Sequence, residues 1–140
     1  ENLYIAGLLH DIGKIGVPDA ILCKQDKLTD EEYEIMKTHT TRGAEILSPL
    51  TGFEEVINGV KFHHERFDGK GYPEGLKGEQ IPLSARIVIV ADAIDAMLSD
   101  RPYRDALTMK RVLGELKDYA GTQFDPDIIE IIQKGHVLLG

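Results

Sequence analysis

The stretch that reveals most about the fold is His63-His64-Glu65-Arg66-Phe67-Asp68-Gly69-Lys70-Gly71-Tyr72-Pro73. Two adjacent histidines stand directly before a segment that is too rich in glycine to continue as a helix or a strand. From there to Leu83 the apolar residues show no periodicity, whereas aromatic and charged residues are frequent. A connection of about 20 residues without regular structure is unusual in a compact domain, and such loops are normally functional or disordered. We therefore predict a long functional loop that follows a helix ending in two histidines.

Outside this loop the apolar residues recur at helical spacing. A capping box, Thr29-Asp30-Glu31-Glu32, predicts a helix from residue 30 to about residue 47. Ser84 is predicted to cap a buried helix through Ile87 and Val90, although this β-branched run would also suit a strand. The other predicted helices cover residues 1–11, 18–22, 53–63, 108–119 and 125–136. The fold is therefore predicted to be all-α.

Composition and charge restrict the functional class. A chain of 140 residues has the length of one domain. Its single cysteine, Cys23, provides no disulfide framework and favours a reducing compartment, so we expect a cytoplasmic location. No apolar run is long enough for a membrane segment. The net charge of −8 argues against binding a nucleic-acid polymer, although an acidic body can still carry a local positive pocket for a small anion.

Four of the five histidines lie in contexts that are typical of metal ligands. Neutral imidazole and carboxylate groups donate lone pairs to divalent ions. A single histidine is more often structural, but together these four predict a metal site. The candidate ligands are His10, Asp11, His39, His63, His64 and Asp92. Spacing alone leaves open whether adjacent ligands share one centre or serve neighbouring centres. His136, the fifth histidine, is expected to be a solvated residue.

Four motifs of the chain occur together in one known family. They are Leu9-His10-Asp11-Ile12-Gly13-Lys14, the His63–Pro73 stretch, Ala85-Arg86-Ile87 with Ala91-Asp92, and Asp100-Arg101-Pro102-Tyr103-Arg104. With them the chain resembles the HD-GYP domains, a branch of the HD-domain metal-dependent phosphohydrolases that degrade the bacterial second messenger cyclic di-GMP. The resemblance extends from about Leu8 to Asp127. It implies an HD-domain helical bundle with a long glycine-rich GYP loop.

The resemblance also implies roles for individual residues. Asp11 would bridge two metal ions. His39, His63 and His64 would complete one centre, while His10 and Asp92 would belong to the other. Two or more divalent ions are implied, with iron or manganese expected. A metal-activated water would then hydrolyse cyclic di-GMP to linear pGpG and/or GMP. Asp11 and Lys14 are the expected catalytic residues, with Lys14 contacting a phosphate or assisting the leaving group.

One feature of the family has no counterpart here. Family members carry a further histidine on a helix upstream of the His-Asp pair, and too few residues precede His10 to supply it. We expect residues 1–140 to form a single HD-GYP domain lacking its upstream first helix. The centre containing His10 and Asp92 would be one ligand short, so slow hydrolysis or none is expected from this chain. Exposed apolar surface would favour a homodimer, and an upstream sensor or receiver domain is expected in the parent protein.

Three further residues are candidates for substrate contacts. Tyr72 could stack on a guanine and contact a phosphate, or it could simply anchor the loop on the core. Arg101 and Arg104 carry guanidinium groups that suit bidentate phosphate contacts. Glu65 and Asp68 are expected to have a structural role, in which ion pairs tie the long loop together.

Two alternatives to a cyclic di-GMP phosphodiesterase remain open. A catalytically impaired domain could bind cyclic di-GMP or a protein partner and relay a signal. Retention of the six candidate ligands argues against this alternative. An HD nucleotide phosphohydrolase acting on mononucleotides is the other alternative, and the GYP loop argues against it.

Overall fold

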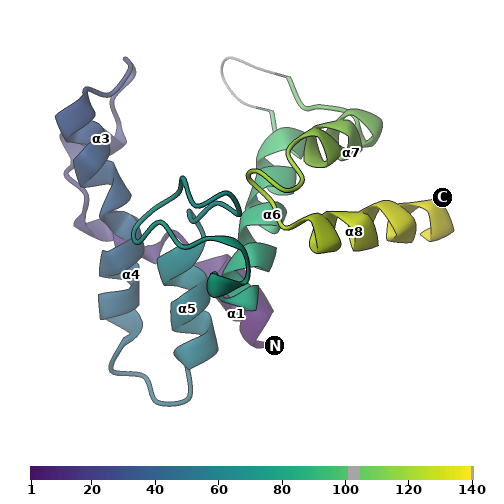
Figure 1. Ribbon diagram of the computed structural model, residues 1–140. Helices are drawn as coiled ribbons and strands as arrows, with labels where there is room; N and C mark the ends of the chain where they lie inside the picture. Colours follow the sequence, from purple (N-terminus) through teal and green to yellow (C-terminus); the bar gives the residue numbers. More distant parts are fainter. Residues whose placement is uncertain (101–104, 140) are drawn as a thin grey trace.

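The computed structural model describes residues 1–100 and 105–139 of the chain. All the regular secondary structure in these residues is helical, so the predicted all-α fold is confirmed (Figure 1). The elements in chain order are α1 (Asn2–Leu9), the 3-10 helix η1 (Ile12–Gly16), α2 (Asp19–Leu22), α3 (Asp30–Lys37), α4 (His39–Leu47), α5 (Glu54–Phe62), the 3-10 helix η2 (Gly78–Gln80), α6 (Leu83–Leu98), α7 (Met109–Asp118) and α8 (Pro126–Leu139). None of the described helices has the length and apolar character required to cross a membrane.

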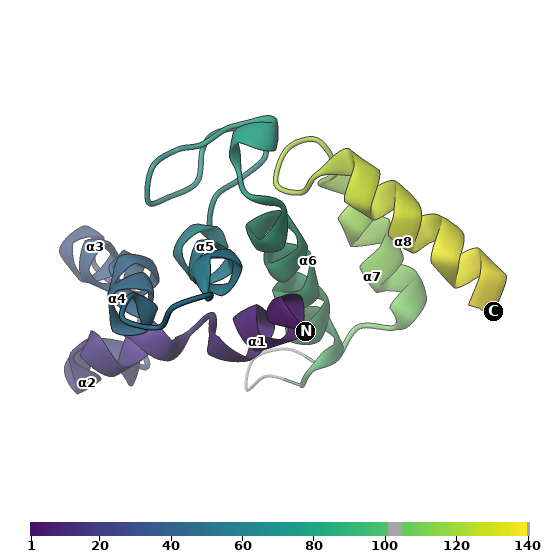
Figure 2. The same ribbon diagram turned by 90° about the horizontal axis from the view of Figure 1, so that it is seen from below.

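Helix α6 lies at the centre of the molecule and joins two hydrophobic clusters. Its residue Val88 packs in a cluster with residues of α1, α4 and α5, whereas Ile89 and Val90 pack in a cluster with residues of α7 and α8. Figures 1 and 2 show α1 and α5 on one side of α6, and α7 and α8 on the other. A helix covered on two sides needs apolar residues around much of its circumference. The β-branched run that would also suit a strand is therefore explained by burial of a helix.

The caps that begin the helices were only partly predicted. The Thr29 capping box is present, and Thr108 accepts a hydrogen bond from the Arg111 backbone at the start of α7. The prediction that Ser84 caps α6 is wrong. Pro82 occupies the N-cap position and Ser84 is a buried residue of the first turn. The fixed φ of proline already sets the chain direction there, so no side-chain cap is needed.

The single helix predicted for residues 30–47 is also wrong, because it is interrupted at Thr38 between α3 and α4. Four successive side chains each donate a hydrogen bond to the backbone carbonyl three residues earlier. The pairs are Thr38 Oγ1 with Ile35, His39 Nδ1 with Met36, Thr40 Oγ1 with Lys37, and Thr41 Oγ1 with Thr38. Side chains that take these carbonyls compete with the regular helical ladder. The interruption also places His39 at the beginning of a new helix.

The long loop between α5 and α6 is held by the buried carboxylate of Glu65. Its two oxygens accept hydrogen bonds from the backbone amides of Glu74, Gly75 and Leu76 at 2.7 to 3.1 Å. Asp68 pairs with Arg66, with 2.8 Å between Oδ2 and Nη2. The structural role expected for Asp68 is therefore confirmed, whereas Glu65 holds the loop through backbone amides instead of the predicted ion pair. These contacts fix the path of the loop beside the ends of α4 and α5.

Candidate metal centre

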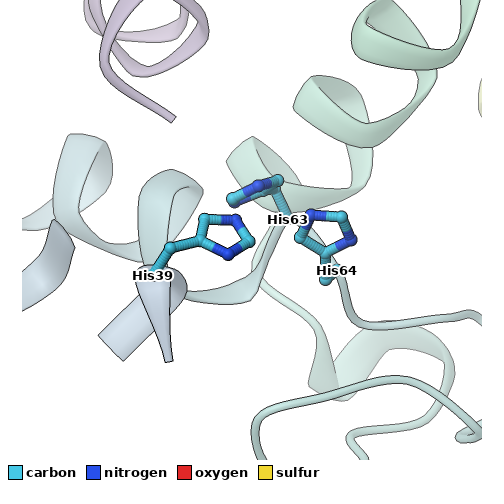
Figure 3. A group of neighbouring side chains, drawn as sticks. All are labelled: His39, His63 and His64. Atoms are coloured by element: carbon cyan, nitrogen blue, oxygen red, sulfur yellow. The ribbon is translucent and has the colours of Figure 1, made fainter. Parts of the chain in front are cut away.

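The ends of several helices bring the six predicted ligands together. His10 and Asp11 follow α1, His39 opens α4, His63 and His64 follow α5, and Asp92 lies within α6. The rings of His39, His63 and His64 gather in one place (Figure 3), with centroids 4.4 to 5.4 Å apart. His10 lies 5.1 Å from His63 by the same measure. The fold thus assembles one cluster from residues far apart in the sequence.

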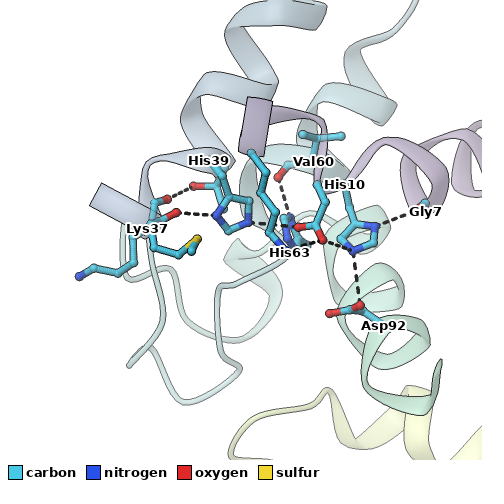
Figure 4. A network of polar contacts seen from close by, with 11 residues as sticks. Gly7, His10, Lys37, His39, Val60, His63 and Asp92 are labelled. Carbon is cyan, nitrogen blue, oxygen red and sulfur yellow. Dashed lines mark hydrogen bonds and ion pairs between the residues drawn. The ribbon is translucent and has the colours of Figure 1, made fainter. Parts of the chain in front are cut away.

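Backbone carbonyls at helix ends orient three of the four imidazoles. Nδ1 of His10 lies 2.6 Å from the carbonyl oxygen of Gly7. The corresponding distances are 2.7 Å from His39 Nδ1 to the carbonyl oxygen of Met36 and from His63 Nδ1 to that of Val60. Figure 4 shows the contacts of His10 with Gly7 and of His63 with Val60. A carbonyl can only accept, so each Nδ1 carries the proton. The last carbonyls of a helix have no partner within it, which leaves them free for this contact. In each neutral ring the lone pair is therefore on Nε2, which is free to bind a metal.

Two of these Nε2 atoms are buried without a hydrogen-bond partner among the described residues, namely those of His39 and His63. Leaving a buried polar nitrogen unpaired costs free energy, and most such groups in folded proteins are paired. Together with His64, the two rings present ligand atoms that lie within 4.8 Å of one another. A divalent ion would satisfy both unpaired nitrogens at once. The donor set therefore fits a metal.

Asp11 lies between two parts of the cluster. Its Oδ1 is 3.5 Å from Nε2 of His39, and its Oδ2 is 3.5 Å from Nε2 of His10. His10 Nε2 is also 3.3 Å from Oδ1 of Asp92. Two donor atoms at metal-ligand distance from one ion are separated by roughly 3 to 3.5 Å. One carboxylate with an oxygen on each side is the arrangement that a bridging ligand requires.

The structure also gives His63 a position that the sequence prediction did not. His63 belongs to the group with His39 and His64, and equally to a group with His10 and Asp11. The resemblance assigned it to the first centre only. Its side chain is almost completely buried. His63 therefore lies within reach of ligand atoms of both groups, but its single Nε2 lone pair can bind only one ion, so Asp11 is the candidate bridging ligand.

The four histidines of the cluster differ in pKa because their surroundings differ. Burial lowers the pKa of His63 to about 3 and that of His64 to about 4, with neighbouring imidazoles adding to the effect. Burial also lowers the pKa of His39. In contrast, the hydrogen bond to Asp92 raises the pKa of His10 to about 9. The cluster therefore contains neutral rings suited to a metal and one ring that holds a proton in the metal-free protein.

We expect proton competition to affect the His10 side of the cluster alone. At pH 7 a metal ion at His10 must displace a proton, so its apparent affinity there should fall about tenfold for each pH unit below 9. Nuclear magnetic resonance titration of the chelator-treated protein should show His10 titrating near pH 9 and His63 neutral down to about pH 4. Asp92→Asn should lower the pKa of His10. An unshifted His10 in the unsubstituted protein would contradict the assigned contact.

Lys14 lies at the open side of the cluster, where it contacts Asp11. Its Nζ is 2.7 Å from Asp11 Oδ2, and both side chains are about 40% exposed. Burial opposes the effect, but this hydrogen bond lowers the pKa of Asp11. An ammonium group beside the candidate bridging carboxylate can reach an anion that approaches the centre.

Tyr72 packs directly against the cluster. Its ring stacks on His64 with 4.8 Å between centroids and an angle of 11° between planes. Burial raises the pKa of Tyr72, and Tyr33 contributes to this effect. One face of the Tyr72 ring is therefore covered by His64, a candidate metal ligand. Through this contact Tyr72 anchors the loop on the cluster. The other proposed substrate contacts, Arg101 and Arg104, lie outside the described residues.

Sequence reasoning missed the backbone contacts of Gly7, Met36 and Val60 that orient the histidine rings. The signal is the position of each histidine three residues after a carbonyl in the last turn of a helix. It also missed Glu34 and Lys37, which line a cavity against Tyr72. The sequence does not show that the loop folds back onto this part of α3.

Comparisons with known proteins agree with this geometry. A family model described as an HD domain matches residues 1–128. The chain is 47% identical over 139 residues to the cyclic di-GMP phosphodiesterase response regulator RpfG of Xanthomonas campestris. It is 46% identical over 137 residues to a cyclic di-GMP phosphodiesterase of Thermotoga maritima. The alignments cover 98% and 95% of this chain, but it spans only 37% of the length of each of these relatives.

The fold also resembles that of a solved structure. The crystal structure of a cyclic GMP-AMP specific phosphodiesterase of Vibrio cholerae matches with a TM-score of 0.71 and 24% sequence identity. The match covers 95% of this chain and 37% of the other. At this identity the likeness supports the fold alone.

Proposed function

This chain belongs to the HD domain family, in its HD-GYP branch, and we propose that it is a metal-dependent phosphodiesterase that hydrolyses cyclic di-GMP to linear pGpG and/or GMP. The observation that carries the proposal is the pair of buried, unpartnered Nε2 atoms beside the carboxylate of Asp11. Relatives with 47% and 46% identity are named as cyclic di-GMP phosphodiesterases. Together, the chemistry of the donors and the likeness favour this reaction.

The residues that we propose to hold the ions are the six candidate ligands. His39, His63 and His64 would form one centre, His10 and Asp92 would contribute to another, and Asp11 would bridge them. Bound divalent ions supply Lewis acidity, which lowers the pKa of a water nucleophile and stabilises charge on phosphoryl oxygens. We propose iron or manganese in two or more sites, because nitrogen and oxygen donors suit both.

The chain itself supplies orientation and charge. The Gly7, Met36 and Val60 carbonyls fix the imidazole rings, so little reorganisation is needed when a ligand arrives. Lys14 is close enough to Asp11 to donate a hydrogen bond to a phosphate oxygen or to the leaving oxygen beside the centre. Tyr72 supports His64 by stacking. Arg101 and Arg104 remain predicted phosphate contacts.

The alternatives are less well supported. The six candidate ligands lie together, which argues against an impaired binding domain, and the loop that carries Tyr72 is packed on the cluster. Neither observation favours a mononucleotide phosphohydrolase. A cytoplasmic location, an upstream sensor or receiver domain and a homodimer stay predictions.

The direct test is hydrolysis by the purified protein loaded with manganese or ferrous iron. We expect conversion of cyclic di-GMP to linear pGpG and/or GMP, measured by chromatography, and faster turnover than with 3′3′-cyclic GMP-AMP or GTP. Lys14→Ala should lower kcat by roughly 10- to 100-fold, which corresponds to a loss of about 1.4 to 2.7 kcal/mol of charge stabilisation. Preferred hydrolysis of GTP would favour the mononucleotide alternative. Tight binding of cyclic di-GMP without turnover would favour the signalling alternative.

A further inference from the structure

A cavity of about 240 Å³ lies directly beside the histidine cluster. It is bounded by the end of α3, the beginning of α4 and the loop at Tyr72-Pro73. The residues lining it are Glu34, Lys37, Thr38, Thr41, Tyr72 and Pro73. Cavities that hold drug-sized ligands are larger, so this one suits a single flat base and not a whole dinucleotide. Tyr72 forms a wall of the cavity and also stacks on His64. A base in this cavity would therefore lie next to a phosphate held at the histidine cluster.

The cavity presents a carboxylate beside an ammonium group. Nζ of Lys37 is 2.6 Å from Oε1 of Glu34. The Lys37 side chain is only 24% exposed, whereas that of Glu34 is 69% exposed. Lys37 is held further by two aromatic rings, because its Nζ lies 5.4 Å from the centroid of Tyr33 and 5.6 Å from that of Tyr72. The ammonium is thus fixed in place, while the carboxylate can turn toward a ligand.

We propose that this cavity binds one guanine of the substrate, with Glu34 accepting from the N1–H and the N2 amino group and Lys37 donating to O6. The inference rests on the proposed function. A carboxylate offers two acceptors, which match the two adjacent donors of guanine. Adenine lacks the N2 amino group. Its N1 accepts and its N6 amino group donates, whereas N1–H of guanine donates and O6 accepts. The ion pair would therefore determine which base the enzyme accepts.

The fold does not require this ion pair. Exposed pairs of this kind contribute little to stability, especially when one partner is on the surface. Both partners lie in α3, whose neighbouring acidic residue Glu31 is also exposed but does not line the cavity. Glu31→Gln removes the same charge from the same helix. It is therefore a matched control for Glu34→Gln.

The test compares equilibrium binding of cyclic di-GMP and cyclic di-AMP, which differ only in their bases. Calorimetry on the metal-loaded protein, with calcium in place of the active metal, should show preference for cyclic di-GMP. Glu34→Gln should reduce this preference by about 10- to 100-fold, because a good bidentate contact discriminates between bases by that order. Glu31→Gln should leave the ratio of the two dissociation constants unchanged.

Three outcomes would overturn the inference. They are equal binding of both ligands by the unsubstituted protein, an unchanged ratio in Glu34→Gln, or an equal fall in Glu31→Gln. If the unsubstituted protein hydrolyses cyclic di-GMP while the ratio is insensitive to Glu34, only the base assignment fails. If the protein neither binds nor hydrolyses cyclic di-GMP, the proposed function fails with it.

Discussion

Replacing His63 and His64 together by alanine should remove most of the bound metal and reduce hydrolysis of cyclic di-GMP by at least roughly 100-fold. Loss of a group that merely orients a ligand typically costs 10- to 100-fold, so loss of two ligands should cost more. His63 has the larger share in this expectation because its Nε2 is buried without a hydrogen-bond partner among the described residues. Metal content of the purified protein and the initial rate at saturating manganese measure the two effects.

The experiment must separate loss of ligands from loss of folding. His63 is almost fully buried, so alanine leaves a cavity as well as an unpaired Val60 carbonyl. Glutamine at both positions keeps more of the volume and should still abolish the metal centre, with the helical circular dichroism retained. His136→Ala removes a histidine that the sequence assigns to neither centre. If the double variants and His136→Ala contain equal metal, the proposed ligand set is wrong.

Much of this cluster could be predicted from the sequence because histidine and aspartate stand where helices end. His10, Asp11, His63 and His64 follow the last turns of α1 and α5. Periodicity locates such ends to within a few residues, and the predicted helices around the cluster largely match the observed ones. These four candidate ligands therefore follow from the positions of helix ends, whereas Asp92 lies within α6 and His39 lies within the single helix predicted for residues 30–47.

Other features of the site depend on contacts that the sequence does not display. The interruption at Thr38 arises from four side-chain hydrogen bonds to the backbone, while helical propensity alone favours a continuous helix through residue 47. Without that interruption, His39 would lie inside a continuous helix and not at the beginning of α4. The pairing of Lys37 with Glu34 and their approach to Tyr72 depend on how the long loop returns, which has no local signature. Tertiary packing decides these features.

Gly13→Ala should destabilise the protein by about 3 kcal/mol, because overpacking against backbone atoms lies at the upper end of the usual range. A Cβ at this position would lie 1.8 Å from the carbonyl oxygen of His39 and 2.5 Å from the backbone nitrogen of Gly43. Neither atom can move aside by rotating a side chain. The 3-10 helix η1 and α4 must therefore separate. Because Asp11 precedes Gly13 and His39 opens α4, metal affinity should fall as well, by roughly 10-fold or more.

Gly114→Ala provides the matched control within the same chain. Gly114 lies inside α7, and a Cβ there would meet nothing within 4 Å. The same substitution should therefore stabilise the protein by up to about 1 kcal/mol through helix propensity and leave metal affinity unchanged. Urea unfolding of the metal-free protein measures both variants. Effects of opposite sign would mean that the tight contact between η1 and α4, and not glycine as a residue type, holds Asp11 against His39. If Gly13→Ala left the free energy of unfolding unchanged, the contact between η1 and α4 would be able to relax. Other contacts would then determine the distance between Asp11 and His39.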